Sequence, residues 1–164
     1  SAEALQQIVF WSMGSLTRAN WAANGVLAAV LIIALPILWA LGWRLTALRL
    51  GDARATAMGI NTSRLRVVVL IVVSLVAATT VAFAGIIGFI GLVGPHIARM
   101  LVGEDQRYFL PASMAAGAAV MCAAHAVSLM IKPGLAIPIG IVTSLLGVPF
   151  FIAIVMTRRR ALWT

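Results

Sequence analysis

Charge is scarce in this sequence, and so are the side chains that catalysis needs. Only 10% of the 164 residues are charged, and the chain holds four carboxylates, two histidines and one cysteine. A soluble domain of this size needs far more charge to cover its surface, which excludes that class. No glycine-rich phosphate loop with a lysine occurs, so no nucleotide hydrolysis is predicted. Glu104 and Asp105 stand beside Arg107, which favours a solvated turn over an acid–base pair.

The single cysteine and the two histidines predict no redox or metal chemistry. Cys122 lies in an apolar run, where a packed thiol without a disulfide partner is expected. No set of three or more possible ligands is recognised around His96 or His125, so no metal site is predicted. For His125 we expect a hydrogen bond at a helix end or inside a bundle; a direct role in transport is the alternative.

Long uncharged runs take the place of charge, because 63% of the residues are hydrophobic. A helix of about 20 apolar residues crosses a hydrocarbon core of about 30 Å. Three runs fit one crossing each, and the longest, Val67–Ala98, divides near Gly85–Gly88 into a full helix and a shorter return helix. An all-α polytopic membrane protein with five to six transmembrane helices is predicted, with helices near 20–44, 66–84, 89–103, 108–131 and 137–157.

Glycine recurs every third residue through the last part of the longest run. Small residues let helix backbones approach closely in lipid. Irregular backbone at membrane depth is tolerated only where protein or a water-filled cavity covers it. We therefore predict a covered helix break followed by tight packing, with a hinge or the lining of a path as the alternative. The residues concerned are Gly85, Gly88, Gly91, Gly94 and the following Pro95.

The net charge of +8 is explained by membrane topology. Lysine and arginine concentrate in cytoplasmic loops, and ten of the twelve basic residues fall in alternate segments, around 44–66, 99–107 and 158–160. These segments are predicted to be cytoplasmic, together with the C-terminus. No basic or aromatic periodicity supports nucleic-acid binding.

The loop Leu50–Arg66 is the most functional-looking polar segment. Asp52 is suited to cap a short helix over Ala53–Met58, and Gly59 to end it in a left-handed conformation. A second short helix is expected to start after Asn61-Thr62-Ser63. The pattern predicts a compact knob that can receive force from a soluble partner.

In order along the chain, four segments resemble the FecCD family, the permease subunits of ABC importers for iron–siderophores, haem and cobalamin. The resemblance covers nearly the whole sequence, and the run GFIGLVGPHIAR is its most specific part. The segments are WSMGSL (11–16), LGDARATAMGI (50–60), GIIGFIGLVGPHIARMLVGEDQRYFLP (85–111) and IPIGIVTSLLGVPFF (137–151).

The resemblance implies a type II importer permease of ten transmembrane helices, working as a dimer in the cytoplasmic (inner) membrane of a bacterium. Residues 1–164 would form one transmembrane domain, the C-terminal portion of the permease, and residues 1–13 the outer end of a helix whose beginning is absent. The implied partners are a second permease subunit, two ATPase subunits that hold ATP and Mg²⁺, and a substrate-binding protein. The chain itself would bind no cofactor and would not be an enzyme.

The resemblance also implies roles for particular residues. The loop over 50–66 would be a coupling loop that docks on the ATPase, and the translocation path would be lined by small and apolar residues near the last helix. The coupling residues are Gly51, Asp52, Arg54, Ala55 and Gly59, and the path residues are Ile141, Ser144, Leu145 and Gly147.

Three polar positions of the family pattern are missing. This chain has His125, Leu129 and Ala136 where the family usually has an aspartate, an arginine and a glutamate. The missing arginine tends to meet the binding protein, and Lys132 is the nearby cation expected to replace it. A lysine that reaches from a helix end to the membrane surface is the alternative.

Import of an iron–siderophore complex by alternating access is the leading interpretation. Haem or cobalamin is the alternative cargo, and a non-transporting membrane scaffold or remnant fragment is the alternative class. An ion-coupled transporter needs an acidic residue inside a span, and no carboxylate lies in a predicted span.

Overall fold

The computed structural model describes residues 1–16, 19–131 and 138–160, with side chains at all of these except 131 and 157–160. All regular structure within these ranges is helical, which confirms the predicted fold class. The helices are α1 Ala2–Ser12, α2 Trp21–Ala40, α3 Gly42–Leu48, α4 Asp52–Ala57, α5 Thr62–Ala84, α6 Ile90–Val102, α7 Gln106–Ile131 and α8 Ile139–Arg160.

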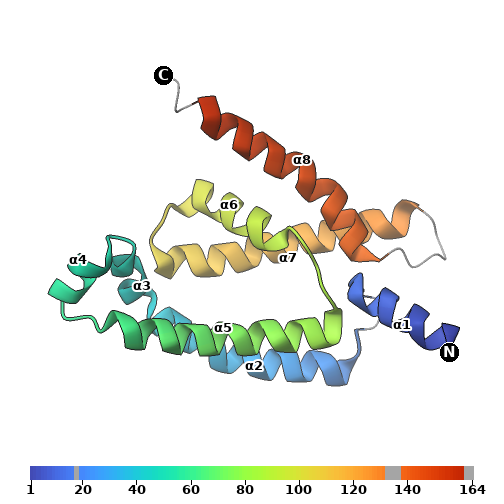
Figure 1. The fold of residues 1–164 in the computed structure, drawn as a ribbon, viewed down its shortest axis with the longest axis horizontal. Helices are drawn as coiled ribbons and strands as arrows, with labels where there is room; N and C mark the ends of the chain where they lie inside the picture. Colours follow the sequence, from blue (N-terminus) through green and yellow to red (C-terminus); the bar gives the residue numbers. More distant parts are fainter. Residues whose placement is uncertain (17–18, 132–137, 161–164) are drawn as a thin grey trace.

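The long helices are arranged as two pairs and one crossing helix (Figure 1). Helix α2 lies along α5, α6 lies along α7, and α8 packs against both α6 and α7. The short helices α3 and α4 lie together at one end of the molecule, the end at which α6 turns into α7 and α8 finishes. Helix α1 lies at the opposite end, where α5 finishes.

Four of the described helices are long and apolar enough to cross a membrane, namely α2, α5, α7 and α8. Helix α6 is apolar but has only 13 residues, about 20 Å of helix, which does not cross a 30 Å core alone. At most 22% of any span is buried inside the structure. The remaining apolar surface is available to lipid or to other protein.

Helix starts follow local capping chemistry. The Asn20 side chain accepts the Ala23 N–H at 2.8 Å and so begins α2. In the same way Asn61 accepts the Arg64 N–H at 2.9 Å and begins α5. Two boundaries differ from prediction: the helix expected over 20–44 divides after Ala40, and the short helix expected after Ser63 is the first turn of α5.

The predicted break in the long uncharged run, between the helices expected near 66–84 and 89–103, lies where the glycines begin. Helix α5 ends at Ala84 and α6 starts at Ile90. Gly85 has a φ of +76°, and a Cβ atom there would collide with the Trp11 carbonyl oxygen. Glycine is therefore required at this position by both backbone conformation and space.

Gly91 and Gly94 lie inside the continuous helix α6, which also contains Pro95, whereas Gly88 lies in the irregular segment between α5 and α6. A Cβ atom on Gly94 would lie 3.1 Å from the Gly117 Cα and the Ser113 carbonyl oxygen, both in α7. At Gly91 nothing lies within 4 Å of that position. The stripe therefore contains packed and open positions: Gly85 and Gly94 are closely packed, whereas a Cβ atom would have room at Gly88 and Gly91.

Candidate functional site

The loop Leu50–Arg66 folds into a knob built on α4. The Ile60 N–H donates to the Ala55 carbonyl at 3.1 Å, and the Gly59 N–H to the Thr56 carbonyl at 2.9 Å. This is the hydrogen-bond pattern of a Schellman motif, with Gly59 in the left-handed position at φ +79°. The predicted helix end at Gly59 is confirmed.

The predicted cap at the start of α4 is wrong. The N-cap is Gly51, at φ 101°, and no side chain caps the helix. Asp52 is the first helical residue, and its carboxylate instead accepts a hydrogen bond from the Arg66 guanidinium at 2.7 Å. Both side chains are more than half exposed, so this ion pair contributes about 1 kcal/mol or less. It ties the first turn of α4 to the first turns of α5.

A small apolar core holds the knob together. It consists of Ala47, Ala55, Ile60 and Leu65, of which Ala55 is 0% exposed. Ala55 therefore cannot contact a partner directly, which corrects its predicted place on the docking surface; its role is to seat α4. The outer surface of the knob presents Asp52 and Arg54 together with the apolar side chains of Leu50 and Met58, which are 56% and 50% exposed.

Polar contacts join the base of the knob to the turn between α6 and α7. Arg49 forms an ion pair with Glu104 at 2.7 Å and also donates to the Glu104 carbonyl at 3.2 Å. Thr46 accepts the N–H of Gln106 at 3.0 Å and donates to the Asp105 carboxylate at 3.5 Å. We call this set the base clamp.

The prediction of a merely solvated turn at Glu104-Asp105 missed the base clamp. The residues that bond to each other in the base clamp are 55 to 60 positions apart in sequence. No local pattern connects them, so only the tertiary fold reveals the contact.

At the opposite end, α1, the glycine break and the start of α8 surround a groove of about 740 Å³. Three predicted path residues line it: Ile141, Ser144 and Leu145. Among the residues that the structure describes, no charged side chain lines this groove. The other lining residues are Ser12, Met13, Ile86, Gly88, Gly140, Val148 and Pro149.

Glycines allow the backbones around this groove to come together. A Cβ atom on Gly140 would collide with the Met13 carbonyl oxygen, so the start of α8 lies directly against the end of α1. Gly147 does not line the groove; a Cβ atom there would collide with Phe89. Its observed role is close packing of α8 on the residue that precedes α6.

The remaining candidate residues do not form a site among the residues described. No group of three or more histidine, cysteine, aspartate or glutamate side chains is close enough to hold a metal there. His96 packs edge-on against Phe150 with the ring centres 5.4 Å apart. Cys122 is exposed on α7, contrary to the predicted packed thiol. Lys132 and Ala136 lie outside the described residues.

Residues 1–157 match the sequence profile of the FecCD transport family. This chain belongs to the FecCD transport family. It is 40% identical over 152 residues to the Fe(3+)-citrate import system permease protein of Bacillus subtilis, covering 93% of this chain and 46% of that protein. It is 37% identical over 158 residues to the hemin transport system permease protein of Yersinia pestis, covering 96% and 47%.

A solved structure agrees with this FecCD assignment. The chain matches an inward-facing conformation of a metal-chelate type ABC transporter with a TM-score of 0.87 and 37% identity, covering 93% of this chain and 50% of that one. The chain thus spans about half the length of the FecCD relatives it matches. The two relatives are named for different cargoes, so what they share is the role of a membrane permease, a transport subunit.

Proposed function

We propose that this chain forms part of the permease of an ABC importer that moves an iron–siderophore complex across the cytoplasmic membrane by alternating access. The observation that carries the proposal is the placement of an uncharged groove and a charged knob at opposite ends of one helical bundle. Cargo would pass along the groove, and force would arrive at the knob. Residues 1–164 act as one transmembrane domain, with 50–66 as its coupling loop.

The orientation follows from charge. Seven arginines lie at one end of the molecule, in α3 and just after it, in α4, at the start of α5, in the last turn of α6 and in the first turn of α7; they are at positions 44, 49, 54, 64, 66, 99 and 107. Because basic residues favour the cytoplasmic side, this end is placed in the cytoplasm together with the C-terminus. The groove then opens toward the outer side, where a binding protein delivers cargo and Lys132 is proposed to help it dock.

Energy is supplied from outside this chain. We assign ATP and Mg²⁺ to partner ATPase subunits, which would receive the knob through Asp52, Arg54 and the exposed Leu50 and Met58. An exposed apolar pair beside opposite charges is a suitable contact for a protein partner. A second permease subunit, identical or related, would complete the path.

The base clamp gives this proposal a specific route for movement. A shift of the knob would pull on Glu104 and Asp105, and through them on α6 and α7. Substitution Arg49→Gln is expected to lower uptake several-fold while ATPase binding is retained, because the partner-facing residues are untouched. Uptake and ATPase co-purification, measured in parallel, test this.

A double-mutant cycle supplies the control. If Arg49 acts through Glu104, the double variant Arg49→Gln/Glu104→Gln should transport no worse than either single variant. Additive losses from the two substitutions would show that the two residues act independently and would contradict the relay.

Filling the groove should block cargo without disturbing coupling. Ser144→Phe adds a ring at the middle of the groove lining, and we expect uptake to fall at least tenfold while ATP hydrolysis by the complex continues. Ile152→Phe places the same ring at a residue of α8 that is 55% exposed and does not line the groove. Equal transport by both variants would contradict a path through the groove.

The cargo is tested by uptake into vesicles that contain the complete permease, its ATPase and its binding protein. ATP-dependent uptake of labelled ferric siderophore, and not of haem or cobalamin, is expected. Haem is the second candidate, because a relative with 37% identity is named for hemin transport. Failure of all three cargoes in an assembled complex would overturn the iron-chelate assignment.

A further inference from the structure

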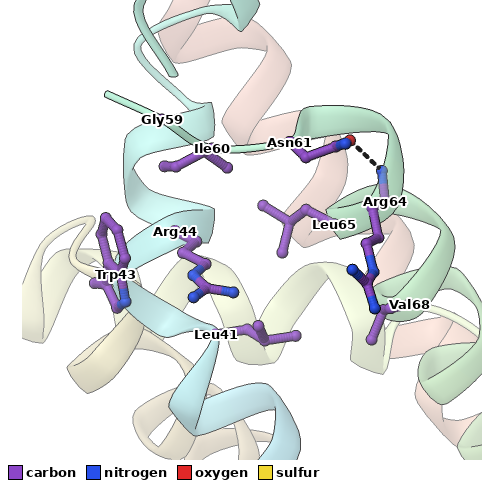
Figure 2. A pocket seen from close by; sticks show the side chains of 9 residues that line it. All are labelled: Leu41, Trp43, Arg44, Gly59, Ile60, Asn61, Arg64, Leu65 and Val68. Atoms are coloured by element: carbon purple, nitrogen blue, oxygen red, sulfur yellow. Dashed lines mark hydrogen bonds between the residues drawn. The ribbon is translucent and has the colours of Figure 1, made fainter. Parts of the chain in front are cut away.

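A pocket of about 480 Å³ lies between α3 and the beginning of α5, beside the knob (Figure 2). Arg44 of α3 and Arg64 of α5 extend into it from different helices, with Leu65 between them. Leu41 and Val68 line the end nearest α2, and Gly59 and Ile60 line the other end. The pocket therefore combines two guanidinium groups with an apolar wall.

Neither arginine is neutralised within the part of the chain that the structure describes. The recorded ion pairs there use Arg49, Arg66 and Arg99 instead. Arg44 rests on the ring of Trp43 at 5.5 Å, a contact that orients the guanidinium but leaves its charge. Two cations that share one pocket repel each other, and an anion between them removes that cost.

The surface around the pocket indicates which kind of anion would bind there. The apolar helices α2 and α5 run directly from its wall, and side chains just beyond it are exposed, with Trp39 and Leu70 both 64% exposed. Trp43, which is 43% exposed, lines the pocket itself. Tryptophan concentrates at the membrane–water interface, where lipid phosphates lie.

We propose that the Arg44–Arg64 pocket binds the phosphate headgroup of an anionic phospholipid, with the acyl chains lying on α2 and α5. Guanidinium groups bind phosphate oxygens through paired, charge-assisted hydrogen bonds. Basic pockets between membrane helices are suited to acidic lipids. A free anion or an acidic protein segment would use the arginines but would leave the apolar wall unused.

A lipid site at this place is independent of the cargo and of the coupling role of the knob. A bound lipid in this pocket would hold α3 against the beginning of α5. The knob would then keep its position relative to the membrane surface while its outer face engages a partner.

The test uses the complete permease that contains this chain, purified and placed in nanodiscs or detergent with defined lipid. Binding of short-chain phosphatidylglycerol and phosphatidylcholine is measured by native mass spectrometry. Phosphatidylglycerol is expected to bind preferentially, and Arg64→Gln or Arg44→Gln should each weaken that binding about tenfold, or ~1.4 kcal/mol. Arg54→Gln removes the same charge from α4, outside the pocket, and should leave binding unchanged.

Other outcomes overturn the proposal. Equal binding of the two lipids would show that the charge of the headgroup is not recognised. An equal loss in Arg54→Gln would reduce the effect to general surface charge. If inorganic phosphate alone protects the protein against heat as well as phosphatidylglycerol does, the acyl chains contribute nothing and the lipid assignment fails. Loss of ATPase association with lipid binding intact would assign the arginines to a protein contact. Thermal unfolding in neutral lipid identifies any variant that fails to fold. In that case, the competition between phosphatidylglycerol and phosphatidylcholine for the unmodified protein decides the question.

Discussion

ATP-driven uptake is expected to disappear when Gly59 is replaced by proline. Gly59 has a φ of +79°, and its N–H closes the end of α4 on the Thr56 carbonyl at 2.9 Å. Proline holds φ near −65° and has no N–H, so it removes both features. Because Ile60 follows directly and belongs to the buried core of the knob, the whole knob would be displaced.

The same position offers a graded control. Asparagine adopts the left-handed conformation more readily than other non-glycine residues, so Gly59→Asn should keep most of the uptake. Gly59→Ala should lie between the two, at a cost of about 1–2 kcal/mol in the knob. Space does not limit any of these side chains, since nothing lies within 4 Å of a Cβ atom there.

Two measurements separate coupling from folding. Uptake into vesicles reports transport, and co-purification of the ATPase reports docking. Proline at 59 lies outside the apolar spans, so the amount of permease in the membrane should stay near the unmodified level. Full uptake by Gly59→Pro would refute the assignment of the knob as the coupling element.

A large loss of stability is expected when Gly94 is replaced by valine. A Cβ atom there would lie 3.1 Å from backbone atoms of α7, which cannot rotate away as a side chain can. Valine adds two further methyl groups, and α6 would have to move off α7. Overpacking of this kind costs about 1–3 kcal/mol or more, and we expect Gly94→Val to lower the Tm of the purified permease by about 5 °C or more.

Gly91 is the matched control, because it lies one turn earlier in the same helix and is open on that side. Gly91→Val carries the same helix propensity but meets no neighbour within 4 Å of its Cβ. Thermal unfolding of the two variants in one detergent makes the comparison. An equal Tm for both would show that α6 and α7 do not pack at Gly94 as described.

Much of the fold could be predicted from local pattern. The uncharged runs predicted the membrane helices because burying backbone in lipid requires long apolar helices. Gly85 and Gly59 marked a helix break and a helix end, because each adopts a backbone conformation that other residues rarely reach. The motif order predicted the FecCD family, which the comparison with known proteins confirmed.

Prediction failed where the outcome depended on what another segment provides. Asp52 was expected to cap α4, but Arg66 competes for its carboxylate. Ala55 was placed on the docking surface, yet packing with Ala47 of α3 and Leu65 of α5 buries it. Gly147 resembles a path residue in sequence, and only the position of Phe89 shows that it packs.

The sequence by itself therefore determined that this is an all-α membrane protein, that its longest uncharged run breaks at the glycines, and to which family it belongs. These properties depend on composition and on backbone preferences within a few residues. The tertiary structure alone decided which arginines pair at the base clamp, which glycines are packed, and that Arg44 and Arg64 share one pocket. Such properties depend on contacts between segments far apart in the chain, and no local preference specifies them.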